Sequence, residues 1–99
     1  MTIRFLEEAE AEFDAAVAYY NAQAAGLGTE LAVEVQLGLS RIEKFPEAWQ
    51  RLGRRVRRYR LSQFPYGIVY AALPSEIVVV AVMHLHRAPE YWRERLKRI

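Results

Sequence analysis

Arginine is concentrated in one short stretch of this chain. The segment GRRVRRYRL, residues 53–61, holds five arginines. Guanidinium groups bind carboxylates and phosphates through two parallel hydrogen bonds, so the cluster could face either anion. If the segment is a strand, side-chain alternation places Arg58 and Arg60 on one face and Tyr59 on the other, toward the core. We therefore expect Arg58 and Arg60 on an open face, either as an anion-binding surface or as a charged edge that resists pairing with another sheet.

Histidine, arginine and aromatic residues gather in VMHLHRAPEYWRER, residues 82–95. His84 and His86 are two positions apart at the end of an apolar run, which would place both rings on one face of a strand. Such a pair could hold a metal ion, but no carboxylate or cysteine stands at ligand spacing, so we expect no metal site. Two interpretations stay open: the histidines could move protons on RNA while arginines stabilise the phosphate, or they could be structural.

Length and composition predict one folded domain, residues 1–99. A chain of 99 residues with 53% hydrophobic and 26% charged residues can bury one modest core. The absence of cysteine excludes disulfides and thiolate metal sites, and it fits a reducing compartment. The longest apolar run, residues 77–83, is far shorter than a membrane span, and the N-terminal sequence lacks an apolar signal region. We therefore expect a cytoplasmic protein that makes no contact with membranes.

The charges are divided between the two halves of the chain. Residues 1–50 hold three basic and nine acidic residues, while residues 51–99 hold eleven basic and three acidic residues. Such polarity favours an acidic partner or a phosphate backbone at the basic half. The acidic side chains at positions 7, 8, 10 and 12 suit the positive end of a helix dipole, and we expect them to form a solvated helix face.

The first half of the chain predicts a short strand followed by a helical hairpin. The composition of residues 2–6 favours a short β-strand. Apolar residues then recur at three- and four-residue spacing, which predicts an amphipathic helix that ends at the AGLG sequence at 25–28. A second helix is expected from Thr29, as its N-cap, to Phe45, where Pro46 stops it. A connection this short predicts that the two helices are antiparallel neighbours.

The second half predicts three strands and a closing helix. Residues 55–61, 66–72 and 77–86 are rich in β-branched and aromatic residues and are separated by short turns, which indicates an antiparallel meander. In the third run, the odd and the even positions are both apolar, so both faces of this strand should be covered and the strand should be central in the sheet. Residues 88–99 predict a short basic helix with Pro89 near its start. The fold class is therefore α+β, in the order β-α-α-β-β-β-α, with the first strand joining the sheet by a crossover through the hairpin.

Three aromatic residues outside these clusters are expected to serve packing. Trp49 lies between the hairpin and the sheet in sequence, and we interpret it as a plug over the end of the core. Tyr66 and Tyr70 recur at strand spacing, which is more typical of half-buried packing than of a base-stacking platform.

Four segments appear in an order and spacing that carry a family resemblance: IRFLEEAEAEFDAAVAYY, RIEKFPE, VRRYRLSQFPYGIVYAA and IVVVAVMHLHRAPEYWRERL. Together they resemble toxins of the RelE/ParE superfamily, the toxic half of bacterial type II toxin–antitoxin modules, formerly called plasmid stabilisation proteins. The resemblance covers nearly the whole chain. It implies a small antiparallel sheet with a helical hairpin packed on one face, and a growth-inhibiting protein held by its antitoxin in a hetero-oligomer.

One branch of this superfamily cuts messenger RNA on the ribosome with basic residues on the open face of the sheet. For such a ribosome-dependent endoribonuclease, the catalytic set in this chain would be Arg58, Arg60, His84, Arg87 and Tyr91. Gly67 departs from that pattern, because the nuclease branch has an arginine just before a Leu-Val-Tyr sequence. Losing a transition-state arginine removes much electrostatic stabilisation, which argues against cleavage.

The ParE-like branch poisons DNA gyrase by contact and needs no catalytic set. The long hairpin, the absent arginine and the histidine-rich strand end favour this branch. We therefore expect a ParE-like toxin that binds gyrase without a cofactor and is neutralised by an antitoxin with an acidic C-terminal segment. The alternatives are the ribonuclease and a non-toxic binding module. The residues expected to contact partners are Arg54, Arg55, Arg57, Arg58, Arg60, Trp92 and Arg93.

Overall fold

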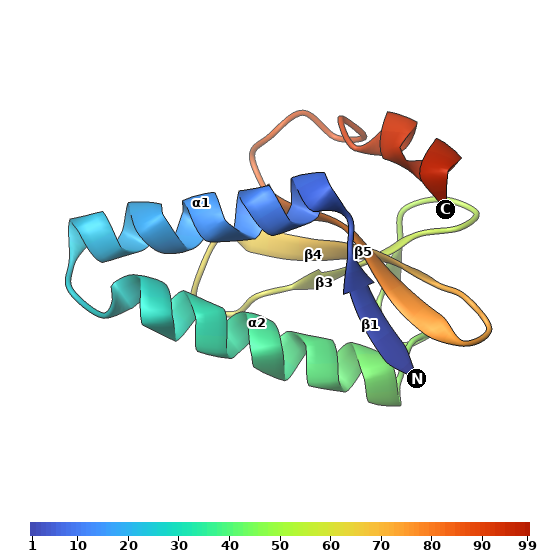
Figure 1. Ribbon diagram of the computed structural model, residues 1–99, viewed down its shortest axis with the longest axis horizontal. Helices are drawn as coiled ribbons and strands as arrows, with labels where there is room; N and C mark the ends of the chain where they lie inside the picture. Colours follow the sequence, from blue (N-terminus) through green and yellow to red (C-terminus); the bar gives the residue numbers. More distant parts are fainter.

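The computed structural model describes all residues, 1–99, and contains the predicted elements in the predicted order (Figure 1). They are β1 (Thr2–Phe5), α1 (Glu7–Gln23), α2 (Leu27–Lys44), β2 (Gln50–Arg51), β3 (Arg57–Arg60), β4 (Tyr66–Ala72), β5 (Glu76–His84) and a closing 3-10 helix (Arg93–Arg98). The α+β class and the order β-α-α-β-β-β-α are confirmed. The two-residue strand β2 is an addition, because so short a segment leaves no periodicity in the sequence.

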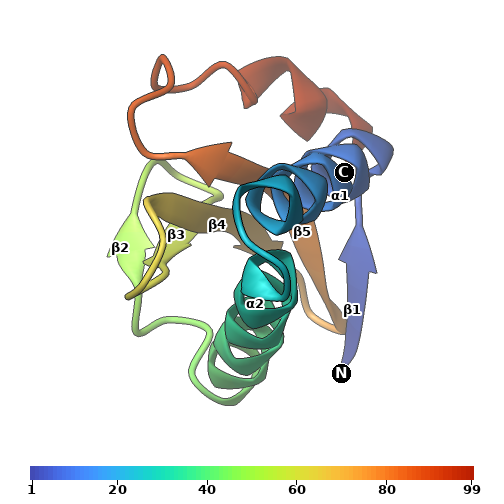
Figure 2. The same ribbon diagram turned by 90° about the vertical axis from the view of Figure 1, so that its left-hand side faces the viewer.

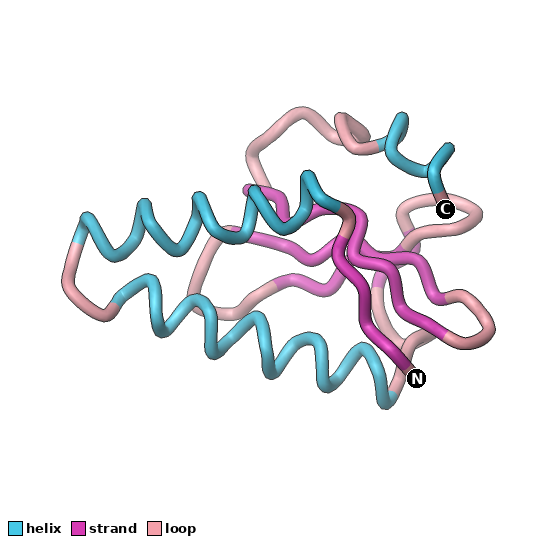
Figure 3. Tube along the Cα trace, in the orientation of Figure 1, coloured by secondary structure: helices cyan, strands magenta, loops and turns pink.

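The strands form one sheet in the order β1-β5-β4-β3-β2. Figure 3 draws the strands in magenta beside the two long helices. β3, β4 and β5 make the antiparallel meander, and β1 pairs in parallel with β5 after the crossover through the two helices. Residues 77–83 of β5 are all buried. The expectation of a central strand with both faces covered is therefore confirmed.

The helical hairpin covers one face of the sheet. Gly38 of α2 approaches Tyr59 and Ile68 so closely that a Cβ atom at this position would lie 2.8 Å from a ring carbon of Tyr59. The missing side chain therefore sets how near α2 comes to β3. Figure 2 shows α2 beneath the sheet and the C-terminal segment on the opposite side.

The C-terminal segment covers the other face through Trp92. The indole is only 2% exposed and is among the largest fully buried side chains. It borders the same surface hollows as Val56, which directly precedes β3, and Met83 of β5. The closing helix begins at Arg93, four residues after Pro89, so the expected start near the proline is too early.

The second helix also begins earlier than Thr29. Its N-cap is Gly26, whose φ of 87° is a conformation that few other residues adopt. The N–H of Gly28 in the first turn donates to Asn21 Oδ1 at 2.8 Å, so a side chain of α1 fixes the start of α2. The prediction of Thr29 as the N-cap was wrong because this contact between the helices is not visible in a local pattern.

Neither helix, nor any other in the structure, combines the length and the apolar composition needed to cross a membrane.

Candidate partner-binding surface

Arg58 and Arg60 lie on the face of β3 opposite the hairpin. Between them in sequence, Tyr59 is buried against α2, so the predicted alternation holds. Both arginines border a hollow of about 550 Å³ that is also lined by Phe64 and His86. The arginine pair and this hollow, which we call the arginine hollow, are the candidate site.

No carboxylate of the chain neutralises this pair. The ion pairs of the structure are made by other basic residues: Arg4, Arg87, Arg93, Arg95, Lys97 and Arg98. Arg58 donates one hydrogen bond, from Nη2 to Oε1 of Gln50 at 2.9 Å, and its buried Nε has no partner. Burial lowers the pKa of Arg58, and the neighbouring charge of Arg60 lowers it further. The pair is thus a positively charged site without a counter-ion from this chain.

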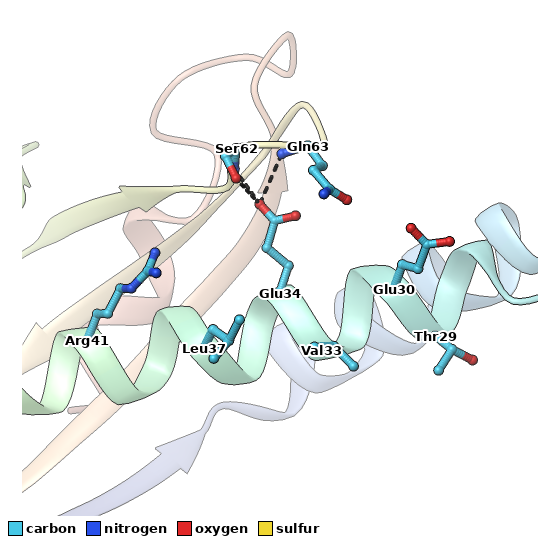
Figure 4. Close-up of a pocket in the computed structure, with 8 residues that line it drawn as sticks. All are labelled: Thr29, Glu30, Val33, Glu34, Leu37, Arg41, Ser62 and Gln63. Atoms are coloured by element: carbon cyan, nitrogen blue, oxygen red, sulfur yellow. Dashed lines mark hydrogen bonds between the residues drawn. The ribbon is translucent and has the colours of Figure 1, made fainter.

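A carboxylate on α2 fixes the loop at the rim of the arginine hollow. Oε1 of Glu34 accepts hydrogen bonds from the N–H of Ser62, from its hydroxyl at 3.1 Å and from the N–H of Gln63 at 3.0 Å (Figure 4). Because Ser62 and Gln63 also line the arginine hollow, the hairpin holds one of its walls in place. No local pattern indicates this role, since Glu34 is one of several acidic residues on the helices.

The two histidines lie at the end of β5 with their rings in contact. The ring centroids are 5.1 Å apart, and His84 also makes an edge contact with Tyr66 at 5.2 Å. Nδ1 of His84 accepts a hydrogen bond from the N–H of His86 at 3.1 Å. This bond fixes the first ring as part of the turn and leaves His86 beside the arginine hollow. No group of three or more potential metal-ligating side chains occurs in the structure.

The remaining arginines of residues 53–61 do not join the pair. Arg57 points to the hairpin side and donates to the carbonyl of Trp49 at 2.9 Å. Arg55 donates to the carbonyls of Leu96 and Ile99 at 3.3 and 3.0 Å, so it holds the C-terminal segment. Arg54 lines a separate hollow that neither Arg58 nor Arg60 borders. The cluster in the sequence is therefore divided among three environments in space.

The expected aromatic packing is present. Trp49 makes an edge contact with Tyr59, with ring centroids 4.7 Å apart, at the end of the core. Tyr70 is fully buried, its hydroxyl donates to the carbonyl of Pro46 at 2.6 Å, and burial raises its pKa to about 12. Tyr66 is half-buried beside His84. Tyr70 is therefore closed to stacking, and the rings of Trp49 and Tyr66 are each engaged by a neighbouring ring.

Arg87 and Tyr91 lie with Glu12, apart from the arginine hollow. The hydroxyl of Tyr91 donates to Oε2 of Glu12 at 2.8 Å, and the Arg87 guanidinium stacks on the tyrosine ring at 3.7 Å. Burial and this hydrogen bond raise the pKa of Tyr91. The expected solvated face of α1 is thus wrong at Glu12, whose side chain is 14% exposed, because the C-terminal segment folds back over it.

Two comparisons with known proteins bear on the identity of this fold. The sequence model described as "ParE toxin of type II toxin-antitoxin system, parDE" matches residues 3–89. The chain belongs to the ParE toxin family. It is therefore a toxin component of a type II toxin–antitoxin system, and an antitoxin is its partner. The resemblance to the RelE/ParE superfamily is confirmed.

A solved structure described as "Chromosomal ParDE TA system from P. aeruginosa" has the same fold as this ParE-family chain. The TM-score is 0.67 at 14% sequence identity, and the match covers 85% of this chain and 95% of that chain. No curated protein matches this ParE-family sequence.

Two expected contact residues of the toxin are placed differently from the arginine pair. Trp92, expected to contact a partner, packs between the C-terminal segment and the sheet and is only 2% exposed. Arg93 is exposed and forms an ion pair with Glu90. The hydrophobic packing of Trp92 against the sheet explains the difference, since an exposed indole there would leave the face of β5 uncovered.

The glycine that departs from the nuclease pattern lies directly beneath Arg58. A Cβ atom on Gly67 would be 2.8 Å from Cδ and 2.9 Å from Cγ of Arg58. The glycine therefore allows the arginine side chain to lie flat on the sheet. In this ParE-family chain, the position is filled by a neighbouring arginine rather than by a side chain of its own.

Proposed function

We propose that this toxin inhibits growth by binding DNA gyrase and that an acidic segment of its antitoxin neutralises it by covering the arginine hollow. The gyrase target follows from the resemblance to the ParE-like branch. One observation carries the antitoxin site: Arg58 and Arg60 lie side by side on the open face without any carboxylate. Two neighbouring guanidinium groups repel each other, and an anion from another chain would relieve that repulsion while forming charge-assisted hydrogen bonds.

The placement of the other expected catalytic residues supports binding over RNA cleavage. His86 lines the arginine hollow, whereas His84, the histidine of the expected catalytic set, does not. The Tyr91 hydroxyl and the Arg87 guanidinium are both engaged by Glu12. A general acid or base must reach the proton that it transfers, and here these groups lie away from the arginine pair. Of the expected catalytic set, only Arg58 and Arg60 line the arginine hollow, which favours binding of an anion over its cleavage.

The charge distribution supports an acidic partner. Residues 51–99 carry eight more basic than acidic residues, and the arginine pair lies in this half. A disordered acidic segment would be steered to it electrostatically, and the association would weaken as salt screens the charges.

The target is tested with purified toxin in two assays. We expect inhibition of gyrase-catalysed DNA supercoiling and no effect on cell-free translation. In cells, this corresponds to filamentation with a DNA-damage response. Cleavage of messenger RNA at codon-linked positions, with supercoiling unaffected, would overturn the gyrase assignment in favour of the ribonuclease.

The antitoxin site is tested with Arg58→Ala/Arg60→Ala. We expect its affinity for the antitoxin to fall at least about tenfold at low salt, with a reduced salt dependence. The matched control, Arg4→Ala/Lys97→Ala, removes the same charge from exposed residues outside the arginine hollow. Equal affinities of the two variants at low salt would show that the antitoxin does not use the arginine pair.

A further inference from the structure

The outer face of α2 carries apolar side chains that nothing in the chain covers. Val33 is 54% exposed and Leu37 is 52% exposed, one helical turn further on. They border a shallow groove of about 350 Å³ between α2 and the loop that holds Ser62 and Gln63 (Figure 4). Exposed apolar residues are common singly, but two adjacent ones beside a groove indicate a contact surface.

Two opposite charges lie at the ends of this apolar pair. Glu30 precedes Val33 and Arg41 follows Leu37, and both line the same groove. They are eleven residues apart, which is about three helical turns, so they point in directions that differ by only about 20°. Glu30 takes part in no ion pair or hydrogen bond of its side chain. Arg41 contacts no carboxylate and donates only to the hydroxyl of Tyr59, at 2.7 Å.

The order acidic, apolar, apolar, basic along α2 is complementary to the same order on a second α2 helix that runs antiparallel to it. We propose that a second copy of the chain docks here, with the two α2 helices antiparallel about a two-fold axis midway along the groove. Val33 then packs against the second copy's Leu37, and Glu30 lies opposite the second copy's Arg41. The two-fold axis repeats each contact, so one face supplies two apolar pairs and two ion pairs.

Charge favours a second copy over an acidic antitoxin segment at this face. Glu30 and Glu34 both line the groove, and Arg41 is its one basic residue. An acidic segment would be repelled, whereas the reversed copy brings one basic group to each exposed acidic one. A single helix pair buries less surface than the roughly 1,200–2,000 Å² of a stable complex, so the dimer is expected to depend on concentration.

The proposal does not depend on the gyrase or antitoxin assignment. The groove and the arginine hollow lie on opposite sides of the loop at Ser62 and Gln63, which line both. A dimer through α2 would leave both arginine pairs free to bind other chains.

The first test is sedimentation of the toxin alone, made by cell-free synthesis, between about 1 µM and 1 mM. We expect a monomer–dimer equilibrium, and Leu37→Glu should raise its dissociation constant at least about tenfold. The control is Tyr19→Glu on α1, a large side chain of similar exposure, 57%, outside the groove. A monomer at every concentration would overturn the proposal. So would a dimer that Leu37→Glu leaves intact.

The second test uses charge reversal and does not depend on the apolar variant folding. Glu30→Arg places two cations at each contact, and Arg41→Glu places two anions there, so each variant alone should be monomeric. Mixed together, they should form a heterodimer, because both contacts become complementary again. Circular dichroism checks that each is folded.

A mixture that stays monomeric would overturn the antiparallel register. If the wild type is monomeric and Leu37→Glu instead abolishes antitoxin binding, the face belongs to the antitoxin and the dimer is excluded.

Discussion

Arg95 and Glu12 form a bidentate ion pair at the edge of β5, with N···O distances of 3.0 and 2.8 Å. Each partner also satisfies a backbone group of that strand. Glu12 accepts the N–H of Val82 at 3.0 Å, and Arg95 donates to the carbonyl of Val80 at 3.0 Å. Because β1 pairs only with residues 76–79 of β5, the ion pair takes the place of the missing neighbour strand.

We predict that Glu12→Ala lowers the free energy of unfolding by about 3 kcal/mol. The side chains of Glu12 and Arg95 are only 14% and 13% exposed, so the change leaves a mostly buried guanidinium and an unpaired backbone N–H. Urea unfolding measures the loss. The control is Glu10→Ala on the exposed side of the same helix, expected to change stability by less than about 0.5 kcal/mol. Equal effects of the two substitutions would refute this role for the ion pair.

The effects of substituting Glu12 and Arg95 on the free energy of unfolding should be strongly coupled. Once Glu12 is removed, Arg95→Ala should cost less than it does in the wild type, by about 1–3 kcal/mol. A double-mutant cycle measures this difference, and additive effects would mean that the two side chains act independently.

Gly38→Ala should destabilise the fold even though alanine favours helices. The new Cβ would lie 2.8 Å from a ring carbon of Tyr59, and overpacking of a buried contact costs about 1–3 kcal/mol, which exceeds the gain in helix propensity of about 1 kcal/mol. Thermal unfolding should show a lower midpoint. Ser40→Ala, an exposed position of the same helix, is the control for propensity alone, and a stabilised Gly38→Ala variant would contradict the close approach of α2 to β3.

Gly67→Ala should weaken antitoxin binding without unfolding the protein. The added methyl group would displace the Arg58 side chain that lies across the glycine. Losing one charge-assisted contact reduces affinity by about tenfold. Gly53→Ala is the matched control, because the nearest atom to its Cβ would be 3.8 Å away. Calorimetric titration compares the two variants, and unchanged affinity would show that the position of Arg58 does not matter.

Tyr70 should make the fold sensitive to alkali. Burial raises its pKa from 10.0 to about 12, while Arg57 opposes the shift. The folded state therefore keeps the phenol protonated where the unfolded chain has lost the proton. The contribution of the protonated phenol is complete below pH 10 and declines as the pH rises toward about 12.

Tyr70→Phe should remove this decline in stability at alkaline pH. Near neutral pH, the variant should be less stable than the wild type because it lacks the hydrogen bond to Pro46. Tyrosinate absorbance and circular dichroism follow the titration, with Tyr19→Phe at an exposed position as the control. Ionisation of Tyr70 in the folded protein at the same pH as an unfolded tyrosine would show that its hydroxyl is not buried.

The local patterns predicted the elements well and the contacts between them poorly. Periodicity placed the hairpin and the meander, and alternation placed Arg58 and Arg60 opposite Tyr59. The prediction failed at Glu12, because its partners Tyr91 and Arg95 are 79 and 83 residues away in sequence. Thr29 was misplaced for a similar reason, since Asn21 of the other helix sets the start of α2.

Sequence alone determined the element types, the central position of β5, the charge division and the family resemblance, because each depends on local periodicity or composition. Only the tertiary structure decided which charges are free. It engages Arg55 and Arg57 with backbone carbonyls and Arg95 with Glu12, while Arg58 and Arg60 have no carboxylate. The physical reason is that a side chain's electrostatic environment is set by whatever the fold packs against it, and most of those neighbours are distant along the chain.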